Sequence, residues 1–243
     1  MMLVSLLLSG LILAKEDSCL SPKIESLQTS GVTLPRYNLF ISAAREAGMT
    51  DVKSVSNGKD SFSSLDWRVS AAINYLTYEV GGRLMSFGLY LGMEAGYSWK
   101  SFSTTDYLSN KDVSFRPEYI GLNPFVEGRL ALGRISPVSF RLGYCYELLT
   151  SARFDGNNRL LVGFNKDCLN KNLHGISLEF LWPLPLWLWD DGRIQLRTGA
   201  KCIFTPILSA NALEYYKGYQ FEVDRTLWCF SIGVSILLGG TDR

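Results

Sequence analysis

The sequence has few of the residues and patterns that metal sites and nucleic-acid-binding surfaces require. It contains one histidine, His174, and its five cysteines form no C-x-x-C pair and no metal-ligand spacing with that histidine, so we expect no metal site and no cofactor held by such a site. Lysine and arginine number 24 against 23 aspartate and glutamate, and no block of like charge occurs. We therefore expect no nucleic-acid partner.

Apolar runs long enough to cross a membrane as a helix are also missing. The first apolar run, Leu3 to Ala14, has twelve residues, whereas a spanning helix needs about 20. Its length suits the apolar core of a secretory signal peptide, and the chain turns polar directly after it. The sequence predicts a cleaved signal peptide over 1–14 and a periplasmic N-terminal tail over 15–35, where no regular alternation occurs.

The chain instead alternates apolar and polar residues with a period of two, which is the pattern of a β-strand with two different faces. In residues 86–99, SFGLYLGMEAGYSW, apolar residues occupy every second position, and glycines, serines, Tyr90 and Glu94 occupy the others. The eight segments with this pattern are 36–48, 65–78, 86–99, 119–132, 138–149, 176–182, 194–204 and 226–239.

The connections between these segments alternate in length. Tight turns are expected over 80–82 and 133–137, and long polar loops over 49–64, 100–118, 151–172 and 206–225. An even number of strands with short turns at one end and long loops at the other is typical of bacterial outer-membrane barrels. We therefore predict an all-β fold, an eight-stranded antiparallel transmembrane up-and-down β-barrel over 36–239.

The second face of each strand distinguishes a membrane barrel from a soluble ligand-binding barrel, which would show the same alternation. A soluble barrel would present long polar side chains to water, whereas this face is rich in glycine and serine, which fit the narrow interior of an eight-stranded barrel. A basic residue facing lipid at the midplane would cost about 2 to 4 kcal/mol. We predict that the charged residues of this face form a paired network in the lumen: Arg68, Glu94, Glu127, Arg129, Arg141, Glu147, Glu179, Arg197 and Lys201. The alternative is that they line an ion-conducting pore or hold a catalytic pair.

Aromatic residues gather near both ends of the predicted strands. Amphipathic rings favour the two membrane interfaces, so this distribution predicts two belts. The belt toward the long loops contains Trp67, Tyr97, Trp99, Tyr119, Tyr144, Tyr146 and Trp228, and the belt toward the short turns contains Tyr75, Trp182, Trp187 and Trp189.

With this leader, strand number, loop asymmetry and pattern of strand glycines, the chain resembles the small eight-stranded outer-membrane proteins of the OmpA, OmpX and OmpW kind over about residues 36–239. The resemblance is one of architecture. It implies export, insertion into the bacterial outer membrane and contact with its lipid. Members of the OmpX and OmpA kind have charged, occluded interiors, which the predicted network resembles, while members of the OmpW kind are associated with a more apolar channel.

Some small outer-membrane barrels are lipid-modifying enzymes with His and Ser at the barrel surface. In this chain His174 and Ser177 fall on opposite faces of a predicted strand, so they cannot pair as neighbours, and we expect no catalytic residues and no enzyme activity. The tyrosine-rich loop over 213–225 suits contact with an extracellular protein or glycan. The sequence thus favours a barrel with a plugged, charged lumen and a structural or surface-interaction role. A narrow channel for small or apolar solutes and a lipid-modifying enzyme are the alternatives.

Overall fold

The computed structural model describes residues 34–54, 58–82, 85–106, 111–132, 135–155, 166–184, 193–210, 221–223 and 226–239. Within these ranges the chain forms ten strands and one short 3-10 helix, η2 (Lys166–Cys168). The strands are β1 (Tyr37–Ser54), β2 (Gly58–Gly81), β3 (Met85–Trp99), β4 (Phe102–Asp106), β5 (Lys111–Leu132), β6 (Ile135–Asp155), β7 (Asn172–Pro183), β8 (Ile194–Ile203), β9 (Phe221–Val223) and β10 (Leu227–Gly239). None of the helices described is long and apolar enough to cross a membrane.

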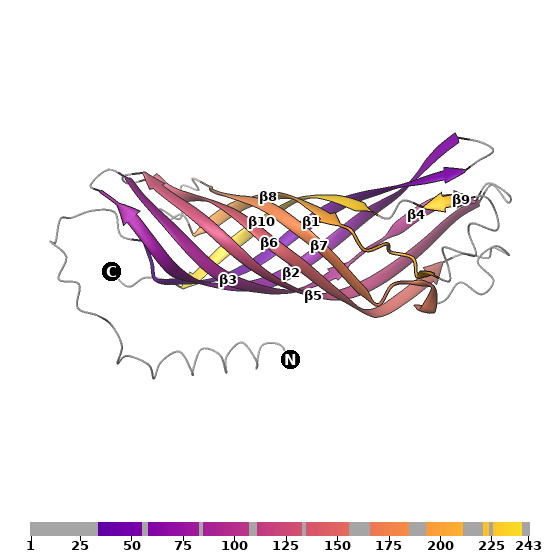
Figure 1. Cartoon of the computed structure of the whole chain (residues 1–243), viewed down its shortest axis with the longest axis horizontal. Coiled ribbons are helices and arrows are strands. Elements are labelled where there is room, and N and C mark those ends of the chain that lie inside the picture. Colours follow the sequence, from indigo (N-terminus) through magenta and orange to yellow (C-terminus); the bar gives the residue numbers. More distant parts are fainter. Residues whose placement is uncertain are drawn as a thin grey trace. The chain divides into compact units, whose positions relative to one another are not determined.

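Eight of the strands close into a barrel (Figure 1). Around the ring the order is β1, β2, β3, β5, β6, β7, β8 and β10, and every neighbouring pair is antiparallel. The ring closes where β10 pairs with β1, from Met49 opposite Trp228 to Leu39 opposite Gly239. The short strands β4 and β9 pair with strand ends at the long-loop end of the barrel. The predicted eight-stranded antiparallel up-and-down barrel is confirmed.

Several strands extend beyond the segments that alternate in the sequence. β1 and β2 stay paired as far as Ser54 opposite Gly58, so most of the loop predicted over 49–64 is a hairpin of paired strands. The segment predicted as a loop over 100–118 contains β4 and the first residues of β5, and β6 runs on to Asp155. A strand that projects past the bilayer has water on both faces and does not need alternating residues, which is why the sequence pattern missed these extensions.

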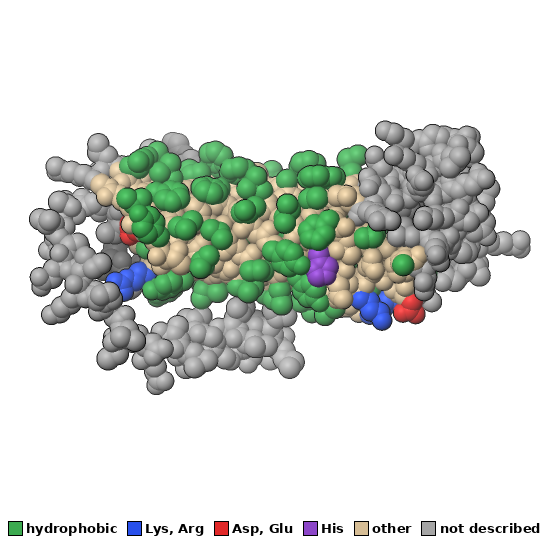
Figure 2. All heavy atoms as spheres, in the orientation of Figure 1, with side chains coloured by type: hydrophobic (Ala, Val, Ile, Leu, Met, Phe, Trp, Pro, Cys, Tyr) green, Lys and Arg blue, Asp and Glu red, His purple; other side chains and the backbone are tan. Residues whose placement is uncertain are grey.

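Along each barrel strand, side chains alternate between the outer face and the lumen. The outer face carries large apolar side chains that are about half exposed, such as Leu91, Leu142 and Ile232. In Figure 2 they cover the middle of the barrel, and the charged side chains visible on this side lie only at the two ends of that band. A continuous apolar band around a barrel is far larger than the patches that soluble monomers expose. The exterior is therefore that of a membrane-spanning barrel.

Glycines of the lumen face allow close approach between neighbouring strands. A Cβ atom added at Gly233 would lie 2.3 Å from the carbonyl oxygen of Ala43 and 2.6 Å from the Cα of Ala44, so the backbone of β1 would have to move. A Cβ added at Gly121 would meet nothing nearer than 3.7 Å. Gly233 is thus needed for the closure of the ring between β10 and β1, whereas Gly121 is not needed for close approach.

Replacing Gly233 by alanine should lower the free energy of unfolding by about 1 to 3 kcal/mol, the usual effect of overpacking. The measurement is urea unfolding of the barrel reconstituted in lipid vesicles. Gly121→Ala is the matched control, and its unfolding midpoint should stay close to that of the wild type. Equal midpoints for the two variants would contradict the close approach at Gly233.

Candidate functional site

The centre of the lumen is organised around Glu94 of β3, which is 1% exposed. Arg197 of β8 donates to both of its carboxylate oxygens, at 3.0 and 2.8 Å. Arg68 lies 2.9 Å and Arg141 lies 3.9 Å from the same carboxylate. Arg197 also forms an ion pair with Glu179 of β7. Side chains of four strands, β2, β3, β6 and β8, therefore meet at one carboxylate, and Glu179 adds a fifth strand through Arg197.

A second group lies toward the short-turn end and is centred on Glu127. Arg129 donates to Oε1 of this carboxylate at 2.6 and 3.1 Å, and Arg141 donates to Oε2 at 2.7 Å. The amide of Asn74 donates to Oε2 as well, at 2.7 Å. Asn38 accepts a hydrogen bond from Arg129 at 3.0 Å and donates one to Asn74 at 2.8 Å. Charge-assisted bonds of this kind are among the strongest hydrogen bonds in proteins.

Aromatic rings pack against the guanidinium groups of this second group. The guanidinium carbon of Arg129 lies 4.6 Å from the ring centre of Tyr90, and that of Arg141 lies 4.6 Å from Phe125 and 4.7 Å from Phe40. The terminal nitrogens of Arg141 find no hydrogen-bond partner among the described residues. The guanidinium lies against the two rings, and one of these nitrogens lies 3.9 Å from the carboxylate of Glu94. Such cation–π contacts are strongest where water is excluded.

A third group lies toward the long-loop end and combines two ammonium groups with three carboxylates. Lys201 donates to Glu46 and to Glu147, both at 2.8 Å. Lys100 lies 3.2 Å from Asp66, 3.4 Å from Glu147 and 3.8 Å from Glu46. Each ammonium group therefore has more than one counter-charge, and each of these carboxylates is paired.

These three groups together form a lumen network with equal numbers of positive and negative groups. Arg68 joins the third group to the centre through Glu46, at 3.4 Å, and Arg141 joins the centre to the second group. Buried charges are tolerated in proteins when they are paired and hydrogen-bonded in this way. The six basic and six acidic members, all buried, are Arg68, Lys100, Arg129, Arg141, Arg197, Lys201, Glu46, Asp66, Glu94, Glu127, Glu147 and Glu179.

The structure places all nine of the predicted network residues in the lumen and adds three that sequence reasoning missed, Glu46, Asp66 and Lys100. The face assignment could have found the first two. Glu46 is one of the alternate residues of β1 that face the lumen. Asp66 directly precedes the outward-facing Trp67 and therefore faces inward. Lys100 follows the end of β3 in a segment without a strand pattern, so no pattern in the sequence indicated that it lies inside.

A cluster of buried apolar residues lies beyond the network, at the long-loop end of the lumen. Phe102 and Phe115 stack there with ring centres 4.9 Å apart, and side chains from the chain segments after η2 and after β8 join them. The buried members of this apolar cap are Phe102, Phe115, Tyr119, Leu149, Leu169, Leu173, Ile203, Ile207, Leu208, Leu227 and Cys229.

The other end of the lumen is filled by the residues that precede β1. The side chain of Leu34 is buried against Tyr90 and Ala131, and the hydroxyl of Tyr90 donates to the carbonyl oxygen of Pro35 at 2.9 Å. The backbone N–H of Leu34 donates to Glu79 at 3.3 Å. Leu34 and Pro35 are the last two residues of the predicted periplasmic tail. The rest of that tail and the predicted signal peptide lie outside the described residues.

The predicted belt aromatics are mostly found on the outer face. Trp67, Trp99, Trp182 and Trp228 are 43 to 54% exposed there, and Tyr97 is partly exposed with its ring edge-on to Trp99 at 4.8 Å. Trp187 and Trp189 lie outside the described residues. The placement of Tyr119 in the belt was wrong: it alternates with the outward-facing Ile120, so its buried ring points into the lumen, 5.9 Å from the ammonium of Lys100.

Comparison with known proteins finds similarity to solved structures alone, since no family model and no curated protein matches the chain. Neisserial surface protein A is 14% identical with a TM-score of 0.41, over 84% of this chain and 99% of that chain. OprG from Pseudomonas aeruginosa is 12% identical with a TM-score of 0.38, over 87% and 99%. Ail of Yersinia pestis, solved with the heparin analogue sucrose octasulfate, is 9% identical with a TM-score of 0.33, over 85% and 100%.

The single histidine lies on the outer face of the barrel. His174 Nδ1 lies 2.6 Å from the hydroxyl of Tyr144, and its ring centre is 5.3 Å from that of Tyr146. Ser177 points into the lumen and is buried, so it is not within reach as a nucleophile for this base. Among the described residues no group of His, Cys, Asp and Glu could hold a metal ion.

Proposed function

We propose that the protein is exported to the bacterial outer membrane, lies there as an integral barrel with a closed lumen, and has a structural or surface-interaction role. The observation that carries this proposal is the burial of the lumen network. Glu127, Arg129 and Arg141 are 0 to 2% exposed even though no strand covers them on the lumen side. In a water-filled pore the side chains that line the pore would be hydrated, so such burial supports an occluded barrel.

The surroundings of the lumen network also favour a permanently closed state. The apolar cap at one end and Leu34 at the other keep water away from the ion pairs. In such a medium of low dielectric the attraction between opposite charges is far stronger than in water, and separating them without new partners is costly. Opening a path through the barrel would require several of these pairs to separate together.

The lengths of the strand connections support an extracellular role for the long-loop end. Outer-membrane barrels have short periplasmic turns and longer extracellular loops. Here the β1–β2 hairpin and the β5–β6 pair continue as far as Ser54 opposite Gly58 and Ser114 opposite Asp155 (Figure 1). Such projections are suited to contact with an extracellular protein or glycan. We propose no catalytic role, because His174 and Ser177 lie on opposite faces of β7.

Wild-type protein reconstituted in planar bilayers should show no stable single-channel steps, because the lumen network and the two apolar ends leave no aqueous path. Heat-modifiable migration on a gel of the protein recovered from vesicles made in parallel shows that the barrel has folded and inserted. Stable steps whose size changes in an Arg129→Gln variant would contradict the closed lumen and favour the narrow channel for small or apolar solutes.

A further inference from the structure

Arg45 is a charged residue on an otherwise apolar part of the barrel wall. It lies on the outer face of β1, where its side chain is exposed and stands between Ala43 and Ala47. The strands on either side place Trp67 of β2 and Ile232 of β10 directly opposite it. A basic residue with such neighbours faces lipid, where it costs free energy unless it finds a partner of opposite charge.

The level of Arg45 is the lower edge of the aromatic belt at the long-loop end. Trp67 of this belt is opposite Arg45. Trp228 of the same belt is opposite Met49, which is four residues nearer to the long loops on β1. Below Arg45 the exposed side chain of Ile41 continues the apolar band. A guanidinium that starts at this level reaches the lipid headgroups when its apolar stem extends upward along the wall.

Arg45 has no counter-charge among the residues that the structure describes. The contact that it makes there is with the ring of Trp67, whose centre lies 5.3 Å from the guanidinium carbon. Its chain neighbour Glu46 points into the lumen, where Lys201 donates to it. A cation–π contact supplies no hydrogen-bond acceptor in the plane of the guanidinium, so the N–H groups of Arg45 stay available to an anionic ligand.

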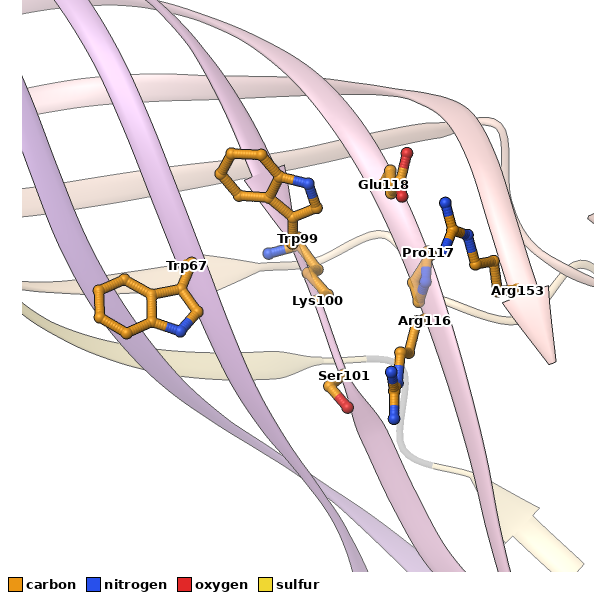
Figure 3. Close-up of a pocket in the computed structure, with 8 residues that line it drawn as sticks. All are labelled: Trp67, Trp99, Lys100, Ser101, Arg116, Pro117, Glu118 and Arg153. Carbon is orange, nitrogen blue, oxygen red and sulfur yellow. The ribbon is translucent and has the colours of Figure 1, made fainter. Parts of the chain in front are cut away.

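The ring of Trp67 also lines a pocket of about 400 Å³ in the outer wall of the barrel (Figure 3). In Figure 3 Trp67 lies on one side of this pocket and Glu118 lies on the other. Glu118 belongs to β5, and its carboxylate accepts hydrogen bonds from the hydroxyls of Tyr97 and Ser151, so it is not a counter-charge for Arg45. The pocket provides room and aromatic surface beside Arg45 for the uncharged part of a ligand.

We propose that Arg45, stacked on Trp67, binds the phosphate of a lipid of the outer leaflet. The planar guanidinium donates two parallel hydrogen bonds to phosphate oxygens, and the bilayer supplies this anion at the level that Arg45 reaches. The rest of the headgroup lies in the pocket beside Trp67, and the acyl chains follow the apolar band past Ile41. The inference rests on the proposed function in one respect, since it requires the barrel to lie in a bilayer with its long-loop end outward.

The test compares two lipids that differ only in phosphate. Full-length protein folded in detergent micelles is mixed with lipid A, a phosphorylated and acylated disaccharide, or with the same lipid after enzymatic dephosphorylation, and the bound lipid is measured by native mass spectrometry. Arg45→Gln should bind lipid A about tenfold more weakly than the wild type does, which corresponds to losing one charge-assisted hydrogen bond. The two proteins should bind the dephosphorylated lipid equally. Arg45→Lys, which keeps the charge, should bind lipid A more tightly than Arg45→Gln.

The matched control is Arg36→Gln, which removes an exposed arginine at the short-turn end and should bind lipid A as the wild type does. Inorganic phosphate at the same concentration should not displace lipid A, because it makes no contact with the apolar band. Unchanged binding in Arg45→Gln, an equal loss in Arg36→Gln, or displacement by phosphate alone would each overturn the inference. Protein dimers that are lost in Arg45→Gln would assign this face to a second copy and would also overturn it. These outcomes are distinct from failure of the proposed function, which the conductance measurement and heat-modifiable migration report separately.

Discussion

Replacing Glu94 by glutamine should lower the free energy of unfolding by about 3 to 5 kcal/mol, the range found when one partner of a buried ion pair is removed. The substitution keeps the shape of the side chain but removes the charge on which Arg68 and Arg197 converge, at 2.9 and 2.8 Å. Both guanidinium groups then stay buried with too little counter-charge. The measurement is urea unfolding in lipid vesicles, followed by the loss of the fast-migrating folded band.

The control for this prediction is Glu118→Gln, which removes a carboxylate from the outer surface and should change the free energy of unfolding by less than about 1 kcal/mol. A second variant that combines Glu94→Gln with Arg68→Met removes the excess positive charge as well and should recover part of the loss, because Glu46, the other partner of Arg68, keeps Lys201. Equal effects of Glu94→Gln and Glu118→Gln would show that the lumen network contributes no more to stability than a surface charge does.

Replacing Leu142 by arginine should lower the stability of the barrel in a bilayer by about 2 to 4 kcal/mol, the cost of a basic residue facing lipid near the midplane. Leu142 lies on the outer face of β6, is 57% exposed, and stands near the middle of the apolar band. Because more than half of this residue is exposed, the loss would come mainly from the lipid-facing surface and not from the core.

The matched control is Leu148→Arg, on the same face of the same strand but six residues closer to the long-loop end. Near the interface an arginine should cost only about 0 to 1 kcal/mol, because its long side chain reaches the headgroups. Urea unfolding of both variants in the same vesicles provides the comparison. An equal effect at the two positions, or a larger one at Leu148, would contradict the placement of the bilayer around the apolar band.

The strands in the membrane could be predicted from the sequence because lipid outside and a polar lumen inside impose opposite demands on successive residues. Gly92 and Glu94 alternate with Leu91 and Met93 for this reason, and the structure shows the same division. Beyond the bilayer both faces of a strand meet water, so successive residues no longer need to differ and the alternation stops. The hairpin extensions of β1 and β2 therefore carried no signal.

The burial of residues at the two ends of the lumen depends on contacts between residues far apart in the chain, which period-two patterns do not encode. Leu169 pairs with Leu208 as an isolated bridge; they lie in two different segments predicted as loops, 151–172 and 206–225, yet both are buried in the apolar cap. Leu34 precedes the first strand and still fills the opposite end. Tyr119 is the opposite case. Its aromatic side chain and its place near a strand end predict the membrane interface, but its position in the alternation of the strand predicts the lumen, where the structure places it.

The most direct test of a closed, dry lumen uses the natural thiol of Cys145, which lies on the lumen face of β6 and is 1% exposed. Folded protein in vesicles is treated with a small, charged methanethiosulfonate reagent, and peptide mass mapping separates Cys145 from Cys202 on the outer face. The account predicts no modification of Cys145 until urea unfolds the barrel, when it reacts fully. Modification of Cys145 in the folded barrel, at a rate near that of the unfolded chain, would show that water passes through the lumen and would contradict the account.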